Sequence, residues 1–398
     1  MPHKRLYHGF KRTNFLTKKQ KERCRSLLSV YVSIALSASP YYNLQAQDLT
    51  LPTGGSVASG QATIVESASK LQINQATQQA IINWKTFNIG TNATVNFTQP
   101  NASALAVNRV TGGSPTKILG NLTANGRVML INSAGMYFSK TAKIDVGTLV
   151  ASTGKIADQN LIDNNFAFDF DSDSGTIVNE GTIRADQVAM LSPNITNQGT
   201  ISSSVGDTVL ASGQRITVNL NNSDRIGVAI SETDLNTLIE NQGAIESAGT
   251  ITIKASAMQS LVDKTINTPG SANQLVADNG VIRLVSSTGS LKAKQVIVDA
   301  GDNGAAYVNG SIDVSNANGQ GGQIEVTGQA VTLDSTANLD ASGATGGGKI
   351  LVGGDWQGSG ETRQAITTTI KSGATLNASA TEMGDGGTIV AWSDISNP

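Results

Sequence analysis

Residues 177–183 read IVNEGTI, and this short pattern recurs as ITNQGTI at 195–201 and as IENQGAI at 239–245. Each copy places Asn two positions after an apolar residue, Gly two positions after the Asn, and Ile at its end. Asn and Gly tolerate positive φ at a sharp turn, whereas the flanking β-branched residues favour strands. The second copy starts 18 residues after the first and the third 44 residues further on, which we interpret as about two periods. A strand and turn that recur at this spacing predict a solenoid.

A second group of repeats fills the C-terminal third of the chain. Residues 312–315 (IDVS), 339–342 (LDAS) and 376–379 (LNAS) each precede a glycine cluster and then a short apolar strand. Apolar and polar residues also alternate at 215–220 (RITVNL) and 249–254 (GTITIK). Alternation puts the apolar side chains of each segment on one face of a strand, so the strand-and-turn pattern extends over most of the chain.

These repeats predict an all-β chain that folds as a single-stranded parallel β-helix, with residues up to about 69 as its N-terminal cap. At ~20 residues and ~4.8 Å per coil, the chain after its leader would make ~17 coils and a rod of ~80 Å. A β-propeller is the weaker alternative because blade signatures are absent. A β-sandwich is weaker because aromatic residues make up only 4% of the chain.

The first 46 residues differ from the rest of the chain. Nine Lys and Arg lie between Lys4 and Arg25 against one acid, and an apolar run at 27–38 follows. That run is too short to span a bilayer, and Ala46 supplies a small residue at a suitable cleavage point. We therefore predict a signal peptide at 1–46, with a retained membrane anchor as the alternative.

Removal of this leader would leave a chain without His or Cys, because His3, His8 and Cys24 all lie within it. Such a chain could form no disulfide, no Cys/His zinc site and no Ser-His-Asp triad. Its formal charge would be about −10, which argues against electrostatic binding of nucleic acid or anionic lipid.

Two segments are predicted to leave the coils. At 161–174, Phe166, Phe168 and Phe170 alternate with other residues and are expected to cover the side of the β-helix rather than bind a ligand. At 231–239, SETD precedes an apolar run, which predicts a short capped helix or a loop outside a coil. We also expect the natural polypeptide to continue beyond residue 398, because no cap signal follows the last strand.

The sequence contains no catalytic constellation. Asp340, Asp355, Asp385 and Asp394 are scattered between turns, where Asp commonly caps the backbone. The glycine-rich stretch 353–358 (GGDWQG) lacks the Lys-Ser/Thr of a phosphate loop. We therefore predict no enzyme and no catalytic, cofactor-binding or metal-binding residues, although polysaccharide-active enzymes on β-helices are a third functional alternative.

Asn-x-Ser/Thr triplets are frequent. They lie at Asn92, Asn96, Asn101, Asn121, Asn194, Asn221, Asn309 and Asn377. A chain rich in Asn and Thr makes such triplets by chance, and the favoured interpretation is that these Asn residues stack at turns. Glycosylation, with the first four as the candidates, is the alternative.

One block carries a resemblance to a known family. Residues 83–90 (NWKTFNIG), 94–97 (TVNF), 107–112 (VNRVTG) and 125–132 (NGRVMLIN) resemble the amino-terminal secretion domain of two-partner secretion exoproteins, the filamentous haemagglutinin and high-molecular-weight adhesin family. The likeness returns at 346–394. It implies a right-handed parallel β-helix with a secretion domain at 47–160 and continuing repeats at 161–398. It also implies recognition by an outer-membrane transporter.

The family carries an Asn-Pro-Asn-Gly turn after its central apolar strand. The matching positions here are Asn132, Ser133, Ala134 and Gly135, so the first and last residues are kept and the middle two are replaced. Ser133 permits a turn but lacks the fixed φ of proline. The resemblance predicts that these four residues contribute to recognition by the transporter.

Taken with the resemblance, the sequence predicts a secreted bacterial surface adhesin. Its partners would be the Sec translocon, the outer-membrane transporter, and a host cell-surface receptor or glycan, with no nucleic acid and no cofactor. It would be secreted or held at the cell surface. A delivery arm of a contact-dependent toxin or cytolysin of the same secretion class is the alternative.

Overall fold

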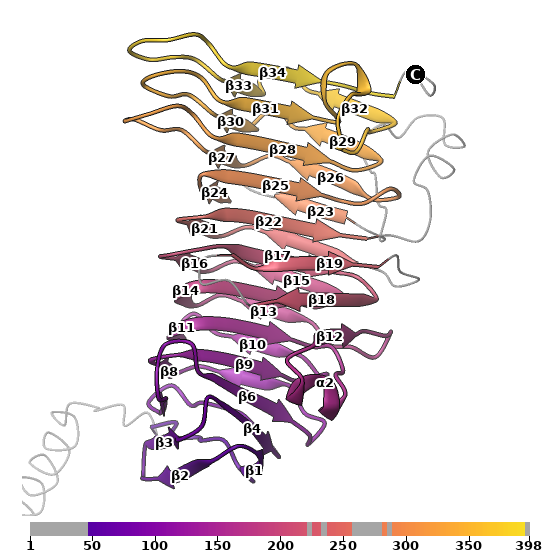
Figure 1. Ribbon diagram of the computed structural model, residues 1–398. Helices are drawn as coiled ribbons and strands as arrows, with labels where there is room; N and C mark the ends of the chain where they lie inside the picture. The colour runs from indigo at the N-terminus through magenta and orange to yellow at the C-terminus, as the bar shows by residue number, and fades with distance from the viewer. Residues whose placement is uncertain (1–46, 221–224, 232–236, 257–280, 285–288, 395–398) are drawn as a thin grey trace, which may run out of the picture. The chain divides into compact units, whose positions relative to one another are not determined.

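The computed structural model describes residues 47–220, 225–231, 237–256, 281–284 and 289–394. The predicted signal peptide, the Asn221 triplet and most of the predicted capped segment at 231–239 lie outside these residues. Described strands stack coil upon coil from the indigo end to the yellow end in Figure 1, and each full coil passes through three faces.

The first two faces contain most of the strands. On the first face the stacked strands are β3 (Lys70–Gln75), β5 (Thr94–Thr98), β8 (Asn121–Ala124), the first half of β11 (Lys143–Ser152), the first half of β14 (Thr182–Leu191), β16 (Thr200–Ser203), β21 (Ala244–Ser247), β24 (Ser290–Lys292), β27 (Ser311–Asp313), β30 (Asn338–Asp340) and β33 (Thr375–Asn377). On the second face they are β4 (Gln79–Trp84), β6 (Leu105–Val110), β9 (Arg127–Ile131), the second halves of β11 and β14, β17 (Thr208–Ser212), β22 (Thr250–Ala255), β25 (Gln295–Asp299), β28 (Gln323–Thr327), β31 (Lys349–Val352) and β34 (Thr388–Ala391).

The third face is a nine-stranded sheet. It stacks β7 (Thr116–Ile118), β10 (Met136–Phe138), β13 (Ile177–Asn179), β15 (Asn194–Asn197), β20 (Leu238–Asn241), β23 (Val281–Leu284), β26 (Ala305–Val308), β29 (Ala330–Leu333) and β32 (Thr367–Ile370). All neighbouring strands within the three stacks are parallel. The predicted all-β parallel β-helix is therefore confirmed.

Aliphatic side chains from successive coils pile on one another inside the helix. Each of the three IVNEGTI-type repeats ends in a buried Ile, and these residues pair directly in neighbouring strands: Ile183 with Ile201, and Ile201 with Ile245. Each buried Ile removes apolar area from water at roughly 25 cal/mol per Å². The alternation of the sequence thus produces one continuous core along the stack.

The same repeats place an amide ladder on the third face. Asn179 Nδ2 donates to Asn197 Oδ1 at 2.8 Å, and Asn197 Nδ2 donates to Asn241 Oδ1 at 2.7 Å. We call these three residues the Asn ladder. The glycines that follow these Asn residues by two positions also stack closely from coil to coil. A Cβ on Gly199 would lie 2.1 Å from the Gly181 carbonyl oxygen. The Asn-x-Gly pattern is therefore a requirement of tight stacking.

The predicted coil number is wrong. Among the residues that the structure describes, the first face stacks eleven strands, not ~17, so at ~4.8 Å per coil this stack is about 50 Å high. Ladder partners Asn179 and Asn197 are 18 residues apart, but Asn197 and Asn241 are 44 apart although they belong to neighbouring coils. The longer step is one coil with a long excursion rather than two periods.

Antiparallel strands cover the N-terminal end of the helix. Strand β1 (Ser56–Ser59) pairs with β4, and β2 (Ala62–Glu66) pairs with β3. These pairings occupy backbone groups that the first coil would otherwise expose. The predicted N-terminal cap is confirmed.

A three-stranded antiparallel sheet packs outside the second face. Its strands are β12 (Phe166–Asp169), β18 (Arg215–Asn219) and β19 (Gly227–Ile230), and helix α2 (Asp158–Ile162) precedes it. Phe166, Phe168 and Phe170 are buried in a second apolar cluster with side chains from the second face. Their predicted covering role is confirmed. The alternating segment 215–220 lies in this outer sheet and not in a coil.

Candidate functional site

The four residues predicted to contact a transporter form one tight turn between β9 and β10. Asn132 is only 2% exposed. Its Nδ2 donates to the Ser114 carbonyl oxygen and to Thr116 Oγ1, both at 2.9 Å, and its Oδ1 accepts from the Ala134 backbone N–H at 3.0 Å. The amide side chain is therefore fully engaged in holding the turn.

Gly135 closes the turn with φ of +111°, a conformation that favours glycine. A Cβ at this position would lie 3.0 Å from the Thr176 carbonyl oxygen in the next coil. Ser133 and Ala134 are half-buried, and the Ser133 carbonyl accepts the Gly175 N–H at 2.7 Å. Among these four, only Ser133 and Ala134 offer side-chain surface to a partner. Their role in recognition stays a prediction.

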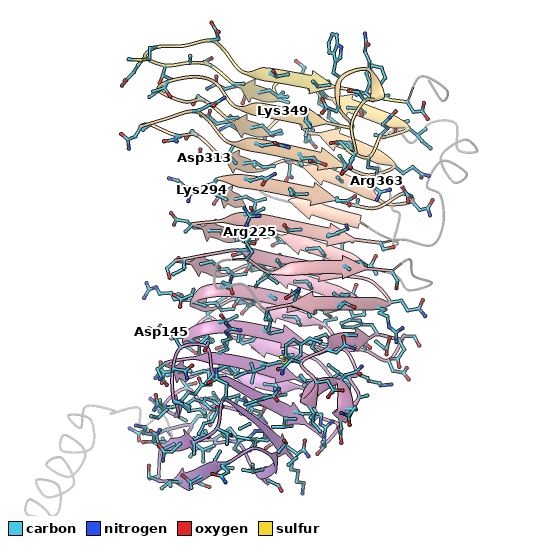
Figure 2. All side chains as sticks on the ribbon, viewed as in Figure 1. Asp145, Arg225, Lys294, Asp313, Lys349 and Arg363 are labelled. Carbon is cyan, nitrogen blue, oxygen red and sulfur yellow. The ribbon has the colours of Figure 1, made fainter. Side chains whose placement is uncertain are left out.

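An open polar cavity of about 940 Å³ runs along the turns between the first and second faces. Its walls draw on six coils, from the β16–β17 turn to the β33–β34 turn. Arg225, Lys294 and Lys349, labelled in Figure 2, line it together with Asp207 and Asp385. Charges nearly balance, and none of the lining residues that the structure describes is aromatic.

Sequence reasoning missed this cavity. Backbone of the glycine clusters at 321–322, 346–348 and 386–387 makes up much of its wall. The sequence predicts a glycine cluster before each strand and a capping role for Asp385, but no cavity. Their recurrence before three successive strands was the available signal, because stacked turns of similar length lie above one another.

A charged cluster covers the outer side of the second face. Asp299 accepts from Arg363 Nε at 2.9 Å and from the Gly301 N–H at 3.0 Å, and Lys254 Nζ lies 3.5 Å from its carboxylate. Arg363 also forms an ion pair with Asp302. Burial alone would raise the pKa of Asp299, but Arg363, the Gly301 N–H and Lys254 together hold that pKa below its usual range.

The pKa of Glu325 is shifted in the opposite direction, above its usual range. Burial raises the pKa of its carboxyl, and the negative charge of Asp299 raises it further against the opposing effect of Lys349. With a folded pKa above its unfolded value, Glu325 stabilises the folded chain below the unfolded pKa and loses this contribution as the pH rises through the folded pKa. The pH dependence due to Asp299 has the opposite sign, because its contribution to the stability of the folded chain is lost as the pH falls through its lowered pKa.

Glu325→Gln is expected to raise the free energy of unfolding at pH 7 and to leave it nearly unchanged at about pH 4. The substitution removes the carboxylate charge that folding must desolvate beside Asp299. Urea unfolding at the two pH values measures the difference. Glu246→Gln, at an exposed position on the first face, is the control. An equal gain in both variants, or a loss at pH 7 for Glu325→Gln, would contradict the prediction.

The four candidate glycosylation sites lie in different surroundings. Asn92 and Asn101 are exposed, whereas Asn96 and Asn121 are half-buried. Asn96 donates to Gln72 Oε1 at 2.9 Å and accepts from Thr123 Oγ1 at 2.6 Å in a ladder across neighbouring coils. Asn121 Nδ2 donates to Thr94 Oγ1 at 3.3 Å. Modification at any of the four stays a prediction.

Two of the scattered aspartates that we assigned to turns have local side-chain partners. Asp340 Oδ1 accepts from the Ser342 N–H at 2.8 Å, and Asp355 pairs with Lys349 Nζ at 2.7 Å. Within the described residues, no three His, Cys, Asp or Glu side chains come together as metal ligands. In the same part of the chain, no helix has the length and apolar character needed to cross a bilayer. The absence of catalysis stays a prediction.

Comparison with known proteins gives matches over most of the chain. The family model described as TPS secretion domain matches residues 48–302. A heme/hemopexin-binding protein of Haemophilus influenzae strain Rd is 35% identical over 215 residues, which are 52% of this chain and 24% of that protein. A second Haemophilus influenzae protein of the same description is 29% identical over 299 residues, which are 69% of this chain and 30% of that protein. The chain thus spans less than a third of the curated relatives it matches.

A solved structure matches the fold closely. The crystal structure of the HMW1 secretion domain from Haemophilus influenzae aligns with a TM-score of 0.70 at 29% identity, and the alignment covers 83% of this chain and 84% of that one. The match includes far more of the chain than residues 47–160. The division at residue 160 stays a prediction.

Proposed function

The chain belongs to the TPS secretion domain family, whose members are exported by two-partner systems, and on this premise we propose that it is the secretion and stalk region of a bacterial surface adhesin. The observation that carries the proposal is the family match over residues 48–302, supported by the structural match to the HMW1 secretion domain. As an adhesin, the chain would carry no enzymatic activity.

The proposed route begins with Sec-dependent export of the chain and removal of residues 1–46. A dedicated outer-membrane transporter then recognises the N-terminal secretion domain, and the turn at 132–135 contributes to that contact. The chain has no cysteine after residue 46, which suits passage through a barrel because no cross-link can block threading. Its final place would be the cell surface or the medium.

Export with and without the transporter tests this proposal. The chain would be expressed with and without a transporter of the two-partner type, in a bacterium that has an outer membrane but lacks both proteins. We expect the chain in the medium or on the surface only when the transporter is present, and we expect such cells to adhere to host cells. Equal release without the transporter would contradict the export step, and release without adherence would contradict the adhesive role.

The names of the curated relatives favour a second candidate function, the binding of haem or hemopexin. Since the chain has no His or Cys after residue 46, direct haem ligation would fall to Tyr or Met. A Soret titration with haem and a pull-down with hemopexin separate these two modes. A negative result in both leaves the adhesive role as the better account.

A further inference from the structure

The loop between β31 and β32 presents an exposed tryptophan. Trp356 lies in the short helix η1 (Trp356–Gly358), and its 65% exposure is the highest among the large apolar side chains that the structure describes. Tryptophan exposes a large apolar area with a polar N–H, and such rings are enriched where proteins bind their partners. The position therefore needs an explanation beyond packing.

Hydrogen bonds fix this loop at several points. Asp355 Oδ1 accepts from the Trp356 N–H at 2.7 Å, and Asp355 Oδ2 pairs with Lys349 Nζ at 2.7 Å. Gln364 Nε2 donates to the Gly358 carbonyl oxygen at 2.6 Å, which ties the two ends of the loop tip together. The indole is thus held on a pre-organised support, which lowers the entropy lost when a ligand binds.

The loop also contains backbone strain. Gln357, next to the exposed ring, has φ of +54°, and Asn164 is the only other non-glycine residue with positive φ among those described. Glutamine lacks the short side chain that lets Asn adopt this conformation, so the arrangement costs about 1 kcal/mol or more and persists only because the surrounding bonds impose it. Strain of this kind is concentrated at binding sites.

We propose that the Trp356 loop, residues 353–365, binds a neutral sugar ring of a glycan. The inference rests on the proposed adhesive function and names its ligand class. A pyranose offers a flat C–H face to the negative face of an indole and hydroxyl groups to flanking amides, here Gln357 and Gln364, both exposed. A protein partner would require a wider apolar patch than one ring.

The charges on the loop argue for a neutral sugar. Its one arginine, Arg363, is held by Asp299 at the end of β25 and by Asp302 in the loop that follows. Lys349, at the base of the loop, is paired with Asp355. Glu361 is exposed on the loop and would repel an acidic sugar.

Binding of the secreted chain to immobilised neutral, sialylated and sulfated oligosaccharides tests the proposal. We expect binding to neutral glycans, with affinity about tenfold weaker in Trp356→Ala, because stacking on the ring is lost. Met383→Ala is the matched control, since Met383 is 64% exposed on another loop, and it should bind as the parent does. Trp356→Phe should recover part of the affinity. Circular dichroism of each variant establishes that the β-helix has formed.

The outcomes are distinct. Neutral glycan binding that falls in Trp356→Ala and not in Met383→Ala supports the site. Equal binding by Trp356→Ala, no glycan bound at all, or binding confined to acidic glycans would overturn it. Adherence of whole cells is measured in parallel. Glycan binding and adherence that both persist in Trp356→Ala defeat this inference and leave the adhesive function standing, whereas parent cells that do not adhere defeat the adhesive function itself.

Discussion

Asn197→Ala is expected to lower the free energy of unfolding by about 2–4 kcal/mol. Asn197 is the middle rung of the Asn ladder, and all three rungs are at most 1% exposed. Truncation leaves the Asn179 amide without its acceptor and the Asn241 carbonyl without its donor, both out of contact with water. An orphaned buried polar group costs about 1–3 kcal/mol, and two are created at once.

The neighbouring residue supplies a matched control. Gln198 Nε2 donates to Gln242 Oε1 at 3.3 Å, which is the same kind of amide contact between the same two coils, but on the exposed side. Gln198→Ala should change stability by less than about 0.5 kcal/mol. Urea midpoints of the two variants measure the difference. Similar losses in both variants would show that burial does not strengthen the ladder.

The sequence was sufficient to predict the strands and their packing. The repeats that contain Asn179 and Asn197 follow one another after 18 residues, so their partnership can be read directly from the chain. The coil count could not be predicted in this way. Alternation at 215–220 has the same period whether the strand packs inside a coil or against its outer side, because either place buries one face. The predicted coil number therefore included the residues of the outer sheet, which lie outside the coils.

The candidate sites depended on contacts that no local pattern encodes. Arg363 reaches Asp299 across 64 residues, and the cavity walls come from six separate turns. The residues in such a pair are separated in the sequence by coils and by excursions of different lengths. Which of them become neighbours therefore cannot be predicted from the sequence unless the length of each coil is known. The turn at 132–135 was found from its resemblance to a family motif, and the structure adds that Asn132 faces inward.

Asn132→Ile and Gly135→Val are each expected to reduce secretion strongly. Asn132→Ile removes both donors to the 114–116 segment and the acceptor for Ala134, which costs about 2–4 kcal/mol. Gly135→Val places a β-branched residue at φ of +111° against Thr176, with strain on the order of 1–3 kcal/mol. Since members of this family are exported by two-partner systems, a deformed turn would impair either recognition or folding at the surface.

Comparison with two further variants separates these causes. Gly373 also has positive φ, at +102°, and a Cβ there would lie 2.7 Å from the Ser335 carbonyl oxygen, so Gly373→Val adds similar strain in a turn that does not contact residues 114–135. Ser133→Glu changes the half-buried surface of the turn while Asn132 keeps its hydrogen bonds.

The measurement is the ratio of the chain in the medium to the chain in the periplasm, and the refolding of each purified variant is measured in parallel. Loss of secretion in Ser133→Glu with normal refolding would indicate that the transporter recognises the turn, because the turn itself is intact in this variant. Equal loss of secretion in Gly373→Val would assign the effect to backbone strain in general, and normal secretion of Gly135→Val would refute any role for the turn.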